Sequence, residues 1–242
     1  MNKVAGKAAL VTGASRGIGR AIAIAFGALG LKVAVNYREQ ADAASETCQE
    51  IEKAGGIAAR FQADVSRKEE VERLIGEVTG RFGGVDVLVN NAGIVHKDCL
   101  ENITEADWDH VLDVNLKSAF LVTQACLPYM RGNQWGRIIN ISSVAALTGG
   151  VTGPVYVASK AGMLGLARSY AAMLIGEGIT ANSIAPALID TDMVSSLNIT
   201  PEKIPLGRFG KVDEVADIAS LLVQNAYVTG QTIHTNGGWY FT

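Results

Sequence analysis

The chain has 242 residues, of which 48% are hydrophobic and 19% are charged, and its formal net charge is −3. This balance gives no electrostatic reason to expect a nucleic acid or an anionic membrane as partner. The longest uncharged apolar run, residues 21–31, is too short to span a bilayer, and the run after Lys3 and Lys7 resembles a strand more than a signal peptide.

Short β-branched apolar runs alternate along the chain with longer segments of helical pattern. The predicted strands are residues 7–12, 32–36, 58–63, 85–90, 137–142, 179–185 and 231–235, and the predicted helices lie near 17–29, 41–54, 67–82, 105–131, 154–177 and 212–224. This alternation predicts βαβ units and a parallel sheet of about seven strands with helices on both faces. The nearly continuous apolar strands agree, because such strands are buried on both sides. We therefore expect residues 1–242 to form one doubly wound α/β domain.

The first predicted strand meets the first helix in the segment VTGASRGIGR, residues 11–20, which fits two incompatible motifs. The G-x-S-x-G run that begins at Gly13 has the spacing of a hydrolase nucleophile elbow, with His234 downstream as a base. The same run, extended to Gly19, is a glycine-rich turn that lets the backbone approach a pyrophosphate. Because the turn follows the first strand of a βαβ unit, its position favours a nucleotide.

Five motifs follow one another in a recognisable order. They are T-G-x-x-x-G-x-G at Thr12–Gly19, N-N-A-G at Asn90–Gly93, Asn115 in DVNLKSAF, Ser143 in NISSVA and Y-x-x-x-K at Tyr156–Lys160. Through these motifs the chain resembles the short-chain dehydrogenase/reductases over essentially its whole length. The stretch PLGRFGKVDEVADIASLL is similar to the 3-oxoacyl-(acyl-carrier-protein) reductase branch, and WGRIINISS resembles acetoacetyl-CoA reductases.

The resemblance implies a single-domain Rossmann fold and an NADPH-dependent reduction of a 3-oxoacyl thioester, or a related ketone, to the 3-hydroxy product in fatty acid biosynthesis. One alternative is a reductase or dehydrogenase of small ketones and alcohols, or of acetoacetyl-CoA. A catalytically silent regulatory protein that keeps the cofactor pocket is another. The complete Asn115, Ser143, Tyr156 and Lys160 set argues against the silent protein.

Tyr156 and Lys160 stand one helical turn apart, so their side chains share one face of a helix. A neighbouring ammonium favours the phenolate, and we expect the pKa of Tyr156 to lie below the usual value of about 10. Carbonyl reduction requires a proton donor poised closer to working pH. The resemblance further implies that Ser143 bonds the substrate oxygen, that Asn115 holds a water leading to Lys160, and that Lys160 bonds the nicotinamide ribose.

Several of these residues also have a plain structural alternative. Asn115 could bond only a helix carbonyl, and Asp64 or Thr191 could cap a helix instead of meeting the adenine or the carboxamide. Strand alternation puts Ser142 and Ser143 on opposite faces, so only one of them can serve the site. Ser143 is chosen because its spacing to the tyrosine matches the family pattern.

The resemblance implies a nicotinamide cofactor along the carboxyl ends of the strands. The expected contacts are Gly13, Ser15, Arg16, Gly17, Ile18, Gly19, Tyr37, Arg38, Asp64, Val65, Asn91, Ala92, Gly93, Tyr156, Lys160, Pro186, Ile189 and Thr191. An NAD-preferring site places a carboxylate at the end of the second strand, but here Arg38 precedes Glu39. Arg38 and Arg16 could each bond a 2′-phosphate, which predicts NADP(H), or both could simply be solvated.

Two departures from the family pattern bear on activity. Ala187 stands where the family shows glycine, which casts doubt on the backbone geometry beside the nicotinamide. Gln134 and Glu177 stand where carrier-protein reductases have arginines beside the site entrance, although Arg131 and Arg137 are near in sequence. Because acyl carrier protein is acidic, we expect CoA thioesters or small ketones to be reduced at least as efficiently as carrier-bound substrates.

No metal is expected, since no His, Asp or Glu cluster has ligand spacing. The three cysteines, Cys48, Cys99 and Cys126, follow no metal or redox spacing and predict reduced packing residues in a cytoplasmic protein. The resemblance implies a homotetramer or dimer that is joined partly through the helix carrying Tyr156.

Overall fold

A computed structural model describes residues 4–96, 100–149, 152–195 and 199–241 of the chain. In it one parallel sheet has the strand order β3-β2-β1-β4-β5-β6-β7. The strands are β1 (Ala8–Val11), β2 (Lys32–Tyr37), β3 (Ile57–Gln62), β4 (Val87–Asn90), β5 (Gly136–Ile141), β6 (Ile179–Pro186) and β7 (Thr232–Thr235). The doubly wound parallel sheet predicted from the sequence is confirmed, because the order reverses between β1 and β4.

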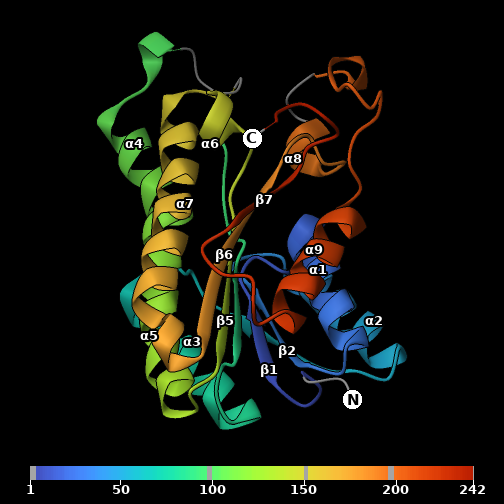
Figure 1. Ribbon diagram of the computed structural model, residues 1–242, viewed down its shortest axis with the longest axis vertical. Coiled ribbons are helices and arrows are strands. Elements are labelled where there is room, and N and C mark those ends of the chain that lie inside the picture. Colours follow the sequence, from blue (N-terminus) through green and yellow to red (C-terminus); the bar gives the residue numbers. More distant parts are fainter. Residues whose placement is uncertain (1–3, 97–99, 150–151, 196–198, 242) are drawn as a thin grey trace.

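Helices cover both faces of this sheet (Figure 1). The first face carries α1 (Gly17–Ala28), α2 (Ala41–Lys53) and α9 (Val212–Gln224), and the second carries α3 (Lys68–Phe82), α5 (Ser118–Gly132) and α7 (Pro154–Leu174). The shorter helices are α4 (Glu105–Leu112), α6 (Ala145–Thr148) and α8 (Asp192–Ser195). Among the described residues, no helix combines the length and the hydropathy that crossing a bilayer requires.

Each strand contributes side chains to two hydrophobic cores. In β1, Ala9 and Val11 pack with the helices of the first face, whereas Ala8 and Leu10 pack with those of the second. Successive side chains of a strand point to opposite faces, so a sheet covered on both sides needs apolar residues at every position. This requirement explains the uninterrupted apolar runs of the sequence.

Residues 105–131 are helical as predicted, but they do not form one regular α-helix. The chain forms α4, then a π-helical turn at Asp113–Lys117, and then α5. A π-helical turn accommodates one extra residue within a helix and frequently marks a functional site. Here it contains Asn115, whose side chain is fully buried.

Two of the three cysteines lie in the described ranges, and both are buried free thiols. Burial raises the pKa of Cys48 to about 11 and raises that of Cys126 further, so both stay protonated at neutral pH. They pack in the two cores, Cys48 on α2 and Cys126 on α5. Cys99 lies outside the described residues.

Candidate active site

The predicted site residues gather at one edge of the sheet, where the strands end. The glycine turn follows β1, Asn91–Gly93 follow β4, Ser143 follows β5 and the segment Ala187–Thr191 follows β6. Because all strands are parallel, their carboxyl ends lie together. In such sheets ligands bind at the carboxyl edge where the strand order reverses, which here is between β1 and β4.

The glycine turn is shaped by its glycines and fastened to the segment after β4. Gly13 and Gly17 have φ angles of +62° and +57°, a region in which other residues are strained. The Asn91 side chain donates to the carbonyls of Thr12 and Gly13, at 2.9 and 3.1 Å. A Cβ at Gly19 would lie 2.4 Å from Asn91 Nδ2, so this packing requires a glycine there.

The N-terminus of α1 follows this turn and has no side-chain cap. The first N–H groups of a helix lack intrahelical partners, and together with the helix dipole they attract an anion. Arg16, at the N-cap position, forms an exposed ion pair with Asp192 at 3.3 Å. An uncapped helix start beside an arginine is an arrangement that favours an anion.

The hydrolase alternative lacks its base in this fold. Ser15 is buried in the turn after β1. His234 belongs to β7, and three strands lie between β1 and β7. A Ser–His pair requires hydrogen-bond contact, so the nucleophile-elbow interpretation does not apply to these two residues.

Ser143, Tyr156 and Lys160 form one cluster between the end of β5 and the first turns of α7. The Ser143 side chain is hydrogen-bonded to that of Tyr156. Lys160 Nζ lies 5.8 Å from the centre of the Tyr156 ring and donates to the Ile141 carbonyl at 2.9 Å. Only 8% of Tyr156 and 4% of Lys160 are exposed, so the cluster is withdrawn from bulk water.

Burial determines the pKa values of this cluster. It raises the pKa of Tyr156, while the hydrogen bond from Ser143 acts in the opposite direction. It lowers the pKa of Lys160 to about 8. The expected decrease in the pKa of Tyr156 is therefore wrong for this structure, because desolvation disfavours both the phenolate and the ammonium.

The two neighbouring serines differ in what they contact. Ser142 donates to the backbone carbonyl of Lys160 at 2.7 Å and thereby fixes α7 against β5. Ser143 meets Tyr156 and also accepts a bond from the Ala145 N–H at 3.2 Å. The structure thus places Ser143, and not Ser142, beside the tyrosine hydroxyl.

Asn115 joins the segment after β4 to α7. Its Oδ1 accepts from the Ile94 N–H at 2.8 Å, and its Nδ2 donates to the Ile94 carbonyl and to Ser159 Oγ. Ser159 in turn donates to the Tyr156 carbonyl at 2.7 Å. A Cβ at Gly93 would lie 3.2 Å from both Asn115 Oδ1 and Lys160 Nζ, so the glycine leaves room for this junction.

At the ends of β2 and β3 the edge is open and polar. Arg38 is exposed and forms an ion pair with Glu39 at 2.7 Å. Asp64 accepts bonds from the N–H and hydroxyl of Ser66, at 3.0 and 2.6 Å, so it stabilises the turn before α3. Burial would raise the pKa of Asp64, but these bonds and the charges of Arg38 and Arg67 lower it. Tyr37 and Val65 are buried beside them.

The segment after β6 crosses the site next to Ser143. The Pro186 carbonyl accepts from the Val144 N–H at 2.9 Å, and the Ala187 N–H donates to the backbone carbonyl of Thr235 at 3.0 Å. Thr191 Oγ1 bonds the Ile189 carbonyl at 3.2 Å. Among the described non-glycine residues only Gln134 has a positive φ, so Ala187 adopts an ordinary backbone conformation.

A family model described as short chain dehydrogenase matches residues 7–202. The chain belongs to the short-chain dehydrogenase family. It is 44% identical over 241 residues to the 3-oxoacyl-[acyl-carrier-protein] reductase FabG of Staphylococcus epidermidis, covering 97% of this chain and 99% of the relative. FabG of Staphylococcus aureus is also 44% identical, with 97% and 98% covered. The 3-oxoacyl-[acyl-carrier-protein] reductase of Synechocystis is 43% identical, with 98% of each chain covered.

One expectation about this short-chain dehydrogenase concerned charges beside the site entrance, and the structure corrects it. Gln134 and Glu177 precede β5 and β6, so they lie at the amino ends of the strands, opposite Tyr156. Arg131 forms a two-bond ion pair with Glu177, at 2.8 and 3.2 Å. Arg137 is buried, where it bonds three backbone carbonyls. Within one chain, none of these residues borders the entrance.

The sequence reasoning missed two buried polar residues that support the site of this short-chain dehydrogenase. Asn36, in β2, accepts from the Gly13 N–H at 3.2 Å and donates to the Ala63 carbonyl at 3.2 Å. Ser159 connects Asn115 to the backbone of Tyr156. An asparagine at the end of an apolar strand was the available signal for Asn36, whereas nothing in the sequence distinguishes Ser159.

Proposed function

We propose that this short-chain dehydrogenase reduces 3-oxoacyl thioesters to 3-hydroxyacyl thioesters with NADPH. The observation that carries the proposal is the buried cluster of Ser143, Tyr156 and Lys160 at the carboxyl edge of the sheet. The relatives named above, which match nearly the whole chain, are 3-oxoacyl-[acyl-carrier-protein] reductases, and this supports the thioester substrate.

The residues present fit a nicotinamide dinucleotide. The glycine turn, in which a Cβ at position 19 has no room, and the uncapped start of α1 would hold the pyrophosphate. Asp64 would meet the adenine amino group, and Ile189 and Thr191 would meet the carboxamide. Arg16 and Arg38, at the open end of the edge, would bond the 2′-phosphate in place of their present carboxylate partners.

When bound, the nicotinamide cofactor would supply a hydride to the substrate carbonyl carbon. The Tyr156 hydroxyl donates its proton to the carbonyl oxygen, and the pKa raised by burial keeps that hydroxyl protonated at neutral pH. Ser143 donates a hydrogen bond to the same oxygen as negative charge develops on it. Lys160 stabilises the remaining phenolate. Asn115 binds the water that leads protons to Lys160, and its bond to Ser159 fixes the position of α7.

The direct test follows NADPH absorbance with purified protein and a panel of acetoacetyl-CoA, a 3-oxoacyl-carrier protein and simple ketones. We expect turnover of the 3-oxoacyl thioesters and none by the Tyr156→Phe variant, which keeps the ring. Equal activity of the two proteins would exclude the mechanism. Binding of NADPH without turnover of any carbonyl would instead support the silent regulatory alternative.

A second candidate is a reductase that serves CoA thioesters in preference to carrier-bound substrates. Arg131, which is paired with Glu177, and Arg137, which is buried, do not border the entrance within one chain, so neither offers a positive charge there to an acidic carrier. The comparison uses one acyl group on both carriers across a salt series. A strong preference for the carrier protein that weakens steeply with salt would exclude this candidate.

We further propose that the protein acts in the cytoplasm as a homotetramer. Exposed apolar side chains, including Trp108 on α4, Phe120 on α5 and Met173 on α7, support burial against other copies. Light scattering on the purified protein measures the assembly, and a monomeric mass at micromolar concentration would contradict it.

A further inference from the structure

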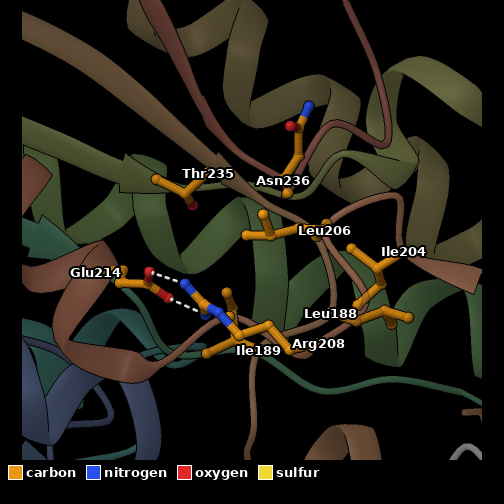
Figure 2. A pocket seen from close by; sticks show the side chains of 11 residues that line it. Leu188, Ile189, Ile204, Leu206, Arg208, Glu214, Thr235 and Asn236 are labelled. Carbon is orange, nitrogen blue, oxygen red and sulfur yellow. Dashed lines mark hydrogen bonds and ion pairs between the residues drawn. The ribbon is translucent and has the colours of Figure 1, made fainter. Parts of the chain in front are cut away.

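A cavity of about 220 Å³ lies at the carboxyl ends of β6 and β7, with the Arg208–Glu214 ion pair at its edge (Figure 2). Its lining includes none of Ser143, Tyr156 and Lys160, so the cavity does not explain how these side chains are held. A methionine thioether from the helix that carries the catalytic lysine, in contrast, touches the lysine directly.

Met163 follows Lys160 by three positions in α7, so the two side chains lie on one face of the helix. Lys160 Nζ donates to Met163 Sδ at 3.8 Å. Met163 is fully buried, and 4% of Lys160 is exposed. A thioether sulfur is a weak but polarisable acceptor, and a bond to a charged donor is stronger than a bond to a neutral one. The contact therefore favours the ammonium over the neutral amine.

The sulfur matters because the ammonium has few acceptors. An ammonium carries three N–H donors. In the part of the chain that the structure describes, Lys160 donates to the Ile141 carbonyl at 2.9 Å and to the Met163 sulfur. These two bonds leave one donor for a ligand. Loss of an acceptor is costly here, since a buried charge cannot replace it with bulk water.

The position of Met163 is fixed by two buried asparagines. Asn140 of β5 donates from Nδ2 to the Met163 carbonyl at 3.1 Å. Its Oδ1 accepts from Asn90 Nδ2 of β4 at 2.9 Å. Both asparagines are buried, and their bonds tie this turn of α7 to two central strands. The sulfur is therefore held in place before any ligand binds.

The other groups that face Lys160 do not supply a second charge. Tyr156, on the same helix, is the titratable neighbour, and its pKa is raised. β5 presents the Ile141 carbonyl, and the π-helical turn presents the uncharged Asn115 across Gly93. Burial alone accounts for the lowered pKa of Lys160, so no described carboxylate contributes to it.

We propose that Met163 is a positioning residue of the catalytic site, whose sulfur keeps the buried Lys160 charged and directed toward the tyrosine. The inference rests on the proposed function for the catalytic task of the lysine. It adds a residue outside the Asn115, Ser143, Tyr156 and Lys160 set, at a position where an aliphatic side chain would fill the same space but offer no acceptor.

The first test measures kcat/KM for acetoacetyl-CoA with NADPH between about pH 6 and pH 10. Met163→Leu keeps the volume of the side chain, and such exchanges usually preserve the fold. Without the sulfur the charged lysine is less favoured, so the midpoint of the alkaline decrease should move to lower pH by roughly half a pH unit. Below the midpoint, kcat/KM should stay within about twofold of the wild type. An unchanged midpoint would overturn the proposal.

The second test needs no substrate, because it follows thermal unfolding of the protein at about pH 6 and pH 9.5. Burial makes the charged lysine costly to the folded state below its pKa of about 8, and the sulfur offsets part of that cost only while the ammonium is present. The decrease in Tm caused by Met163→Leu should therefore be about 2 °C larger at the lower pH.

Met130→Leu is the matched control. Met130 is also fully buried, but it packs against Gly136 at the amino end of β5. Its effect on Tm should be the same at both pH values. Equal behaviour of Met163→Leu and Met130→Leu would overturn the proposal. A wild type that reduces no thioester, while Met163→Leu still shows the pH-dependent loss of Tm, would overturn the proposed function and leave the sulfur–ammonium contact supported.

Discussion

Two regions of the carboxyl edge differ in how their charged and polar groups are held. At β5 and α7, Tyr156 and Lys160 are buried and bonded to fixed backbone or side-chain groups. At β2 and β3, Arg38 is exposed and its partner Glu39 is exposed as well. Buried polar groups are strongly coupled to their surroundings, whereas exposed ion pairs are screened by water and salt. Substitution of Tyr156 or Lys160 should therefore reduce activity strongly, whereas substitution of Arg38 or Glu39 should change activity only slightly.

The largest effect is expected for Tyr156→Phe. The phenyl ring keeps its packing but removes the hydroxyl that supplies the proton, so kcat should fall on the order of a thousandfold. Affinity for NADPH, measured by fluorescence titration, should stay within a few-fold of the wild type. Wild-type turnover by the Tyr156→Phe variant would contradict the contrast between the buried and the exposed regions.

Lys160→Ala should damage binding and turnover together. The side chain serves both the phenolate and the ribose, so kcat should fall on the order of a hundredfold and the Kd for NADPH should rise about tenfold. Steady-state kinetics and titration measure the two effects separately. A change in kcat alone would show that Lys160 acts only on the tyrosine.

The pKa of Lys160 predicts a loss of activity at alkaline pH. The ammonium is present below its pKa of about 8 and is lost as the pH rises through that value. We expect kcat/KM to decrease about tenfold per pH unit above it, because this profile reports the free enzyme. Lys160→Arg stays charged at every pH tested, so its profile should lack this decrease. An alkaline decrease retained in the arginine variant would assign it to another group.

The smallest effect is expected at the open end of the edge. Arg38→Ser should lower kcat/KM for NADPH roughly threefold to fivefold relative to NADH, since exposed charge pairs contribute about 1 kcal/mol or less. Glu39→Gln removes the competing carboxylate and should change the same ratio in the opposite direction. A wild type that uses NADH as well as NADPH would contradict the cofactor assignment.

The sequence predicted those parts of the molecule that depend on local pattern. Alternating apolar runs predicted the parallel sheet, because strands buried on both faces leave a recognisable composition. The glycine turn was predicted from spacing, and its positive φ angles agree with that interpretation. Helical periodicity placed Tyr156 and Lys160 on one face, the family resemblance gave the pair its role, and α7 places Tyr156 beside Ser143.

Contacts between distant segments could not be predicted in the same way. The bond from Asn36 to the glycine turn spans 23 residues, and the ion pair of Arg131 with Glu177 spans 46. The pKa of Tyr156 depends on burial, which a residue spacing does not reveal. The π-helical turn around Asn115 also escaped prediction, because apolar periodicity continues on both sides of it.

The π-helical turn at Asp113–Lys117 sets the rotational phase of α5 relative to α4. An α-helix advances about 100° per residue, so one extra residue rotates everything that follows by about that angle. Deleting Leu116 would restore regular winding and turn Asn115 away from Ile94 and Ser159, or turn the apolar face of α5 away from the sheet. The extra residue therefore lets one helical segment direct the apolar side chains of α5 to the core and the Asn115 side chain to the catalytic residues.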